Sequence, residues 1–113
     1  MPYNKYHNTK VKRDGYTFDS KAEARRYGEL KLLHQAGEIH KLVVHPRYTL
    51  LDPFTVKGIK YRGIVYEADF EFVENGKTVV LDVKGVRTAV FRLKEKLFLN
   101  RYGGKYEFRV EEV

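Results

Sequence analysis

Two aspartates on either side of a tight turn, Asp69 and Asp82, are the residues whose type and spacing best suit chemistry. Asn75-Gly76 lies between them, and this dipeptide is the strongest short-range signal for a two-residue β-hairpin loop. The register of such a hairpin places Asp69 directly opposite Asp82, in a non-hydrogen-bonded pair with Cβ atoms roughly 4.5–5.5 Å apart. Facing carboxylates repel each other, and a divalent cation such as Mg²⁺ or Mn²⁺ removes that repulsion. The pair therefore predicts a metal site; the alternative is that both carboxylates lie on a solvated face.

Lys84 lies two residues beyond Asp82 on the same predicted strand, so its side chain points to the same face. A lysine at this position can orient an attacking water or stabilise negative charge in a transition state. The other face of the hairpin is apolar and is predicted to join the core, since it carries Phe70, Phe72, Val79, Leu81 and Val83.

A third carboxylate, Glu23, lies in the first turn of a predicted helix. The pattern Ser20-Lys-Ala-Glu23 is a capping box, which predicts a helix that begins at about Lys21 and ends near Gly37. At 100° per residue, Glu23 projects into the core-facing stripe that also holds Tyr27, Leu30 and Leu33. Two roles stay open for Glu23, as the partner of the N-cap and as a carboxylate of the metal site.

Three carboxylates and a backbone carbonyl beside Asp82 can hold one or two Mg²⁺ ions and leave water on the metal. Such an ion lowers the pKa of bound water and neutralises charge that develops on a phosphoryl group. We therefore predict a metal-ligand set of Asp69, Asp82, Glu23 and Val83. Other chemistries fit poorly, because Ser20 is the only serine, no cysteine is present, and neither a P-loop nor a dinucleotide fingerprint occurs.

Lys94 lies in the middle of the apolar face of a second predicted helix, which runs from Arg87 to Tyr102 and is closed by Gly103-Gly104. A buried lysine without a partner is costly, so Lys94 should reach the acidic site or a phosphate. The alternative is a lysine that extends along the helix to solvent. The apolar face predicted around it consists of Val90, Phe91, Leu93, Leu97 and Phe98.

The remaining segments complete a mixed sheet. Residues 39–51 are strand-like, and Pro46 makes this an edge strand or a bulged one. Residues 52–63 predict a long excursion or a short extra hairpin, and residues 105–110 a final strand that returns parallel to the Asp82 strand. The predicted order is αβββαβ, a single α/β (α+β) domain over residues 1–113 with a four-stranded mixed sheet flanked by helices.

Positive charge gathers at both ends of the chain, which has a net charge of +7. Residues 1–15 predict an extended basic arm, for which ordering on phosphates and simple terminal disorder are both open. Residues 83–105 are also strongly basic, and this distribution suggests a polyanionic partner. In residues 52–63, basic and aromatic side chains alternate, which is typical both of a nucleic-acid strand contact and of a solvated loop. The predicted nucleic-acid contacts are Lys5, Lys10, Lys12, Arg13, Arg87, Arg92 and Lys96.

Composition indicates a folded domain, since 42% of the 113 residues are hydrophobic. No apolar run is long enough for a transmembrane helix, and the basic N-terminus lacks an apolar signal segment. With no cysteine, disulfides and thiolate zinc sites are excluded and a cytoplasmic protein is expected. Three histidines are expected to pack in the core or lie at the surface and not to bind metal, namely His34, His40 and His45.

The placement of Asp69, Asp82-Val83-Lys84 and a helical Glu23 on an αβββαβ order resembles the PD-(D/E)XK nuclease superfamily. Within it, the chain is similar to a small phage and prophage family. The stretches that carry this closer likeness are Asn4-Lys5-Tyr6, residues 15–25, Gly37-Glu38-Ile39, Asp69-Phe70 and Asp82 to Gly85, with Thr88 and Lys94. The sequence departs from the superfamily motif at Ala68, which stands in place of its proline.

The resemblance implies a Mg²⁺-dependent phosphodiesterase, an endonuclease in which Mn²⁺ would substitute for Mg²⁺. It implies that Asp69 and Asp82 bind the metal, that Glu23 is a further ligand or support, and that Lys84 is the catalytic lysine. Lys94 matches a lysine or glutamine that some members place in the site from the second helix. Analogy with small phage resolving nucleases suggests branched or recombining DNA, such as Holliday junctions, as substrate.

Two rival functions stay open beside the nuclease. One is a nucleic-acid-binding module that keeps the fold without catalysis, although opposed carboxylates have no use in a protein that only binds. The other is a small RNA-binding protein that uses surface tyrosines. Because one site cuts one strand, cutting both strands of a duplex predicts a homodimer.

Overall fold

The computed structural model describes residues 9–113, which form ten strands and two helices. The predicted Lys5 contact and the Asn4-Lys5-Tyr6 stretch lie outside the described residues. The elements in chain order are β1 Val11–Arg13, β2 Tyr16–Phe18, α1 Lys21–Gln35, β3 His40–Val44, β4 Arg47–Leu51, β5 Phe54–Val56, β6 Ile59–Tyr61, β7 Ile64–Glu67, β8 Phe70–Glu74, β9 Lys77–Lys84, α2 Ala89–Tyr102 and β10 Glu107–Glu112.

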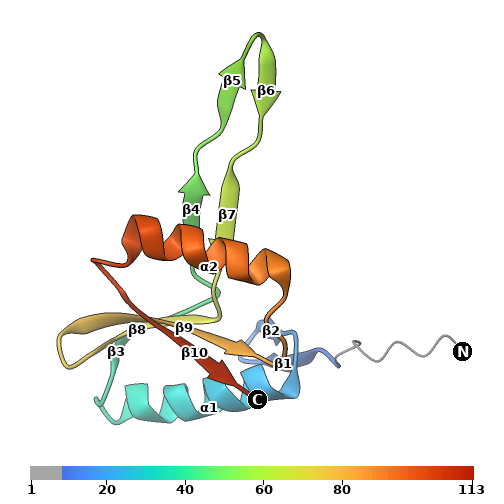
Figure 1. Ribbon diagram of the computed structural model, residues 1–113. Helices are drawn as coiled ribbons and strands as arrows, with labels where there is room; N and C mark the ends of the chain where they lie inside the picture. The colour runs from blue at the N-terminus through green and yellow to red at the C-terminus, as the bar shows by residue number, and fades with distance from the viewer. Residues whose placement is uncertain (1–8) are drawn as a thin grey trace, which may run out of the picture.

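A four-stranded mixed sheet in the order β10-β9-β8-β3 forms the centre of the fold (Figure 1). The β8–β9 hairpin turns at Asn75-Gly76, where both residues have positive φ as the sequence predicts. Its register runs from Glu74↔Lys77 to Phe70↔Leu81, which confirms the predicted pairing over these residues. The chain then crosses through α2 and adds β10 parallel to β9. The predicted α+β class and αβββαβ core are confirmed.

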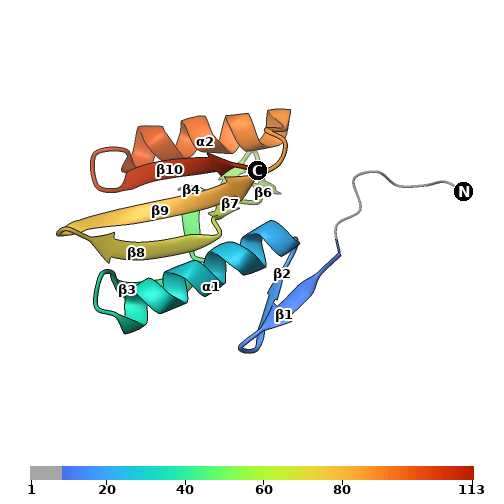
Figure 2. The ribbon, with the colours of Figure 1, turned by 90° about the horizontal axis from the view of Figure 1, so that it is seen from below.

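Helix α1 covers one face of this sheet and α2 covers the other (Figure 2). The α1 side is the predicted apolar face, where a core forms from Phe18, Tyr27, Leu30, Ile39, Phe70, Phe72, Val79, Leu81 and Val83. The α2 side has a second core of Tyr48, Leu50, Tyr66, Ala68, Val80, Phe91 and Phe98. Both faces of β9 are therefore buried, including the face that carries Asp82.

Strands β3 and β8 continue beyond the sheet as β4 and β7, through a bend at Pro46 and Ala68. Two backbone hydrogen bonds keep the ribbon paired through this bend, from His45 N to Asp69 O at 2.9 Å and from Ala68 N to Pro46 O at 3.0 Å. The ribbon then leaves the body and ends in the β5–β6 hairpin (Figure 1). We call residues 47–67 the arm. The predicted extra hairpin within residues 52–63 is confirmed, while residues 39–51 form two strands in two sheets because proline interrupts the ladder.

The last residues of the basic N-terminal segment predicted for residues 1–15 pair with the strand that follows them. Strands β1 and β2 form a short hairpin that turns at Asp14-Gly15. The Asp14 carboxylate attaches this hairpin to α1, since it accepts a hydrogen bond from the Tyr27 hydroxyl at 2.7 Å and lies 2.6 Å from Lys31 Nζ.

Both helices begin and end close to the predicted residues. Ser20 caps α1, accepting a hydrogen bond from Glu23 N at 3.2 Å, and Thr88 caps α2 in the same way through Phe91 N at 3.1 Å. The predicted apolar face of α2 is only partly buried, because Val90 is 64% exposed and Leu93 55% exposed. No helix within residues 9–113 has the length and apolar character needed to cross a membrane.

Candidate active site

Asp82 is the one charged residue that is buried among residues 9–113, with 1% of its surface exposed. Its Oδ2 atom accepts a hydrogen bond from the hydroxyl of Tyr66 in β7. Its Oδ1 atom has no hydrogen-bond partner within the described part of the chain, and Lys84 Nζ lies 3.3 Å from it. The solvated-face alternative is therefore wrong for Asp82. A buried carboxylate with one unsatisfied oxygen is costly unless a cation compensates it.

Asp69 lies at the bend between β7 and β8 and not in the ladder. Regular pairing ends at Phe70↔Leu81, so the predicted cross-strand pair of Asp69 and Asp82 is wrong. The ribbon turns away from β9 here, and the Asp69 N–H donates to the Leu81 carbonyl at 3.2 Å. The Asp69 side chain turns back instead, and its Oδ2 accepts the Val83 N–H at 2.7 Å.

Asp69 and Asp82 still interact through their charges. Burial raises the pKa of Asp69 to about 9, and the negative charge of Asp82 adds to this effect while the Val83 N–H opposes it. Glu23 also raises the pKa of Asp69. The charge of Asp82 therefore acts on Asp69, although the two residues do not face each other in the ladder.

The Val83 carbonyl faces the same side of β9 as Asp69. The N–H and C=O groups of one strand residue point to the same neighbour. Because the Val83 N–H points to the Asp69 carboxylate, the carbonyl of Val83 does too. Its neighbour Lys84 points its carbonyl to the other side, where it accepts the Val113 N–H at 3.1 Å. The predicted ligand role of Val83 is compatible with this orientation.

Glu23 brings the third carboxylate from the first turn of α1. Its carboxyl accepts a hydrogen bond from the Ser20 hydroxyl at 3.5 Å, and the side chain is half-buried. Burial raises the pKa of Glu23, hydrogen bonding with the Asp69 carboxyl lowers it, and the charge of Asp82 raises it. Glu23 therefore shares its electrostatic environment with both aspartates while it also contacts the N-cap.

Lys84 is the cation nearest to this acidic group. Besides its approach to Asp82, its ammonium lies 4.5 Å from the centroid of the Phe91 ring, a cation–π contact with α2. The side chain is half-buried. Contacts on two elements hold Lys84 beside Asp82, as the sequence predicts.

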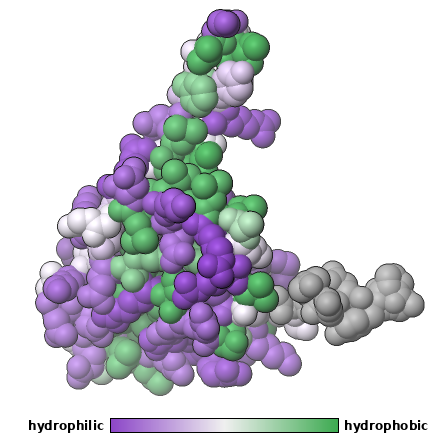
Figure 3. Space-filling model, viewed as in Figure 1, coloured by the Kyte–Doolittle hydropathy of each residue, from purple (hydrophilic) through white to green (hydrophobic). Residues whose placement is uncertain are grey.

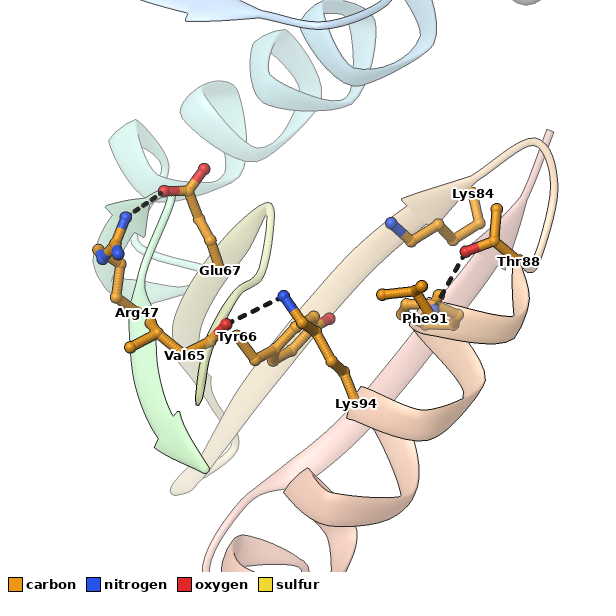
Figure 4. Close-up of a pocket in the computed structure, with 9 residues that line it drawn as sticks. Arg47, Val65, Tyr66, Glu67, Lys84, Thr88, Phe91 and Lys94 are labelled. Carbon is orange, nitrogen blue, oxygen red and sulfur yellow. Dashed lines mark hydrogen bonds and ion pairs between the residues drawn. The ribbon is translucent and has the colours of Figure 1, made fainter. Parts of the chain in front are cut away.

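A pocket of about 440 Å³ opens beside the acidic group, between the base of the arm and the first half of α2. Lys84 and Lys94 extend into it from β9 and from α2 (Figure 4). Lys94 Nζ donates to the Val65 carbonyl at 3.1 Å, so it meets a neutral oxygen of the arm and not the carboxylates. Arg47 and Glu67, ion-paired at 3.2 Å, line the arm side of the same pocket. The pocket is thus lined by more positive than negative side chains.

The other predicted nucleic-acid contacts occupy different surfaces. Lys12 and Arg13 are exposed on the N-terminal hairpin, and Lys10 beside it pairs with Asp19 at 2.9 Å. Arg92 and Lys96 are exposed on α2.

Arg87 is less exposed than Arg92 and Lys96. It is half-buried, and its Nε lies 3.4 Å from Glu112. Of the predicted packing or surface histidines, His34 and His40 are exposed, whereas His45 is half-buried against Phe18 with ring centroids 5.5 Å apart.

Tyr66 is the site residue that the sequence analysis missed. It belongs to β7 of the arm, and its hydroxyl reaches Asp82 only because the ribbon bends between β7 and β8. A tyrosine in an apolar strand is an ordinary core residue, and no local pattern marks it as a partner of Asp82.

The donor set suits a hard divalent cation. Carboxylate and carbonyl oxygens are the ligands that Mg²⁺ and Mn²⁺ prefer, and the buried Oδ1 of Asp82 has no hydrogen-bond partner among the described residues, although Lys84 Nζ lies 3.3 Å from it. Among residues 9–113, no three acidic or histidine side chains converge closely enough to hold an ion by themselves. A ligand set here would include the Val83 carbonyl and water together with the carboxylates.

No curated protein and no solved structure matches this chain. A family model described as "Protein of unknown function (DUF1064)" matches residues 3–111, which is nearly the whole sequence. The chain therefore belongs to the DUF1064 family.

Proposed function

We propose that this protein is a Mg²⁺-dependent DNA endonuclease of the PD-(D/E)XK type. The observation that carries the proposal is the buried Asp82, whose Oδ1 has no hydrogen-bond partner within residues 9–113 and lies 3.3 Å from Lys84 Nζ. Asp69 and Glu23 support the proposal as two further carboxyls whose pKa values are raised by burial and by the charge of Asp82. A purely structural core has no use for such a cluster, whereas a metal-dependent phosphodiesterase needs it.

Asp69, Asp82, the Val83 carbonyl and Glu23 are the groups that would hold Mg²⁺. When bound, Mg²⁺ lowers the pKa of a coordinated water and offsets negative charge on phosphoryl oxygens. Tyr66 fixes one oxygen of Asp82 through its hydroxyl and so directs the other oxygen towards Lys84. The Val83 N–H donates a hydrogen bond to Oδ2 of Asp69 and holds that carboxylate in a similar way.

Lys84 is proposed as the catalytic lysine. Its ammonium is held between Asp82 and the Phe91 ring, and it also lines the basic pocket. From there it can donate a hydrogen bond to a phosphate oxygen or to the attacking water. Lys94, which enters the same pocket from α2, is proposed to hold the DNA phosphate next to the one that is cut.

The substrate is proposed to be DNA in the cytoplasm of a bacterial cell, with branched or recombining phage DNA as the first structure to test. The chain carries a net charge of +7, which favours a polyanion. Cutting both strands would require two copies of the single site described above, so a homodimer is part of this proposal.

The test is a cleavage assay on labelled duplex, single-stranded and four-way-junction DNA with Mg²⁺, Mn²⁺ or EDTA. We expect cutting with either metal, none with EDTA, and none for Asp82→Asn. The matched control is Glu29→Gln, which removes an exposed carboxylate of α1 that pairs with Arg26 outside the site. DNA binding without cutting under any metal would favour a non-catalytic binding module, and full activity of Asp82→Asn would remove the site assignment.

A further inference from the structure

We infer that the arm, residues 47–67, lies in the major groove of duplex DNA next to the cleavage site. This inference rests on the proposed DNA substrate and adds which DNA form is held and by which surface. Figure 1 shows the arm as a two-stranded ribbon that projects from the body beside α2. The major groove, about 12 Å wide, admits a two-stranded β-ribbon.

One side of the arm tip is apolar and exposed. The pairs Phe54↔Tyr61 and Val56↔Ile59 place these four side chains on the same face of the β5–β6 hairpin. They are 43 to 57% exposed, and the rings of Phe54 and Tyr61 stack with centroids 4.9 Å apart. Figure 3 shows apolar side chains along the arm out to its tip. An isolated two-stranded hairpin is marginally stable in water, so this face is suited to cover by a partner.

The positive charge of the arm tip favours a polyanion as that partner. Lys57, Lys60 and Arg62 all lie at or near the tip, and no acidic residue occurs from Pro53 to Tyr66. A second copy of the chain would bring the same cations against them, in a protein that already carries a charge of +7. Duplex DNA offers phosphates to the lysines and arginine, and thymine methyl groups to the apolar face.

The position of the arm connects it to the proposed active site. Its base forms one wall of the pocket that holds Lys84 and Lys94, so positive side chains occur both at the site and at the arm tip. The segment from Leu51 to Lys57, which joins β4 to the arm tip through β5, would span roughly 20 Å if fully extended, since each extended residue adds about 3.3 Å. That length corresponds to about six base pairs at roughly 3.4 Å each, so the arm would contact DNA well beyond the phosphate that is cut.

The test measures binding of a duplex in EDTA at several salt concentrations. The arm variant is Lys57→Ala/Lys60→Ala/Arg62→Ala. The control is Lys41→Ala/Lys77→Ala/Lys105→Ala, which removes three exposed cations at the other end of the sheet. The slope of log K against log salt is negative, and each phosphate contact contributes about −0.9 to it. We therefore expect the slope of the arm variant to be less negative than that of the wild type by about 2 to 3. The control slope should stay close to the wild-type slope.

A second variant, Phe54→Ser/Ile59→Ser, keeps the cations and tests the apolar face. We expect weaker duplex binding with the same salt slope, and a monomer or dimer mass equal to that of the wild type by light scattering. If the wild type forms a dimer that this variant loses while the DNA slope of the triple variant is unchanged, the arm binds a second copy and the inference is wrong. Thermal unfolding of each variant checks that the body remains folded.

The two proposals fail in different ways. DNA cutting combined with an unchanged salt slope of the arm variant overturns the role of the arm alone. A slope that depends on the arm, combined with no cutting under any metal, overturns the nuclease alone.

Discussion

The hydroxyl of Tyr66 donates a hydrogen bond to Oδ2 of Asp82, and so joins the base of the arm to β9, an inner strand of the sheet. The two residues are buried and belong to different strands that are not paired with each other. This contact leaves only Oδ1 of Asp82 facing Lys84. Tyr66 is therefore a positioning residue for the carboxylate and does not need to touch the substrate.

Replacing Tyr66 with phenylalanine should destabilise the metal-free protein by about 1–3 kcal/mol, because a buried carboxylate loses its hydrogen-bond donor. Mg²⁺ affinity should also change, since Asp82 is no longer fixed. Urea unfolding in EDTA and calorimetric titration with Mg²⁺ measure the two effects. The matched control is Tyr48→Phe, because the Tyr48 hydroxyl donates to Glu71 at 2.6 Å, outside the proposed ligand set. Equal Mg²⁺ affinity of both variants would contradict the positioning role.

The stability of the metal-free protein should fall as pH rises. The folded state raises the pKa of Asp69 to about 9, so the folded chain binds more protons than the unfolded chain between the ordinary value of 3.8 and about 9. The contribution of Asp69 to stability is therefore full below 3.8 and is lost as pH rises through about 9. Glu23, whose pKa is also raised, acts in the same direction.

Urea unfolding in EDTA between pH 5 and 9 measures this loss, and Asp69→Asn should reduce it while keeping an oxygen for the Val83 N–H. Added Mg²⁺ should stabilise the protein more at pH 9 than at pH 5, because ligands must lose their protons to bind metal. A pH dependence that is identical in wild type and Asp69→Asn would show that the carboxyl does not titrate in this range.

Local signals in the sequence predict the parts of the fold that depend on neighbouring residues. Asn75-Gly76 determines the hairpin and its register because its backbone conformation suits only one kind of turn. Ser20 marks the start of α1 for a similarly local reason, the satisfaction of an N-terminal N–H. These signals suffice to bring Asp82 and Lys84 onto the correct strand and the same face.

The bend at Asp69 could not be predicted in the same way. Whether the ribbon continues along β9 or turns away into the arm depends on packing between segments that are distant in the sequence. The bend removes Asp69 from the ladder, gives its carboxylate the Val83 N–H, and brings Tyr66 to Asp82. Lys94 differs from expectation for the same reason, because the arm presents the Val65 carbonyl to it.

The N-terminal hairpin should depend on Asp14. This carboxylate accepts a hydrogen bond from the Tyr27 hydroxyl and forms an ion pair with Lys31. These two contacts attach β1 and β2 to α1. Asp14→Ala should therefore increase amide hydrogen exchange in residues 11–18 with little change in β9. The control is Asp19→Ala, because Asp19 forms an exposed ion pair with Lys10, and exposed ion pairs contribute little to stability. Unchanged exchange in Asp14→Ala would show that apolar packing alone holds the hairpin.

Replacing Lys84 with alanine should lower the cleavage rate at saturating DNA by about 10²–10³, the usual cost of removing one group that stabilises transition-state charge. Duplex binding should weaken far less, because Lys84 is one cation among several that line the site and the arm. Single-turnover cleavage and binding in EDTA separate the two quantities. The control is Lys105→Ala, an exposed lysine at the other end of the sheet. Equal losses in rate and in affinity for Lys84→Ala would reduce Lys84 to a phosphate contact and leave the chemistry to the carboxylates.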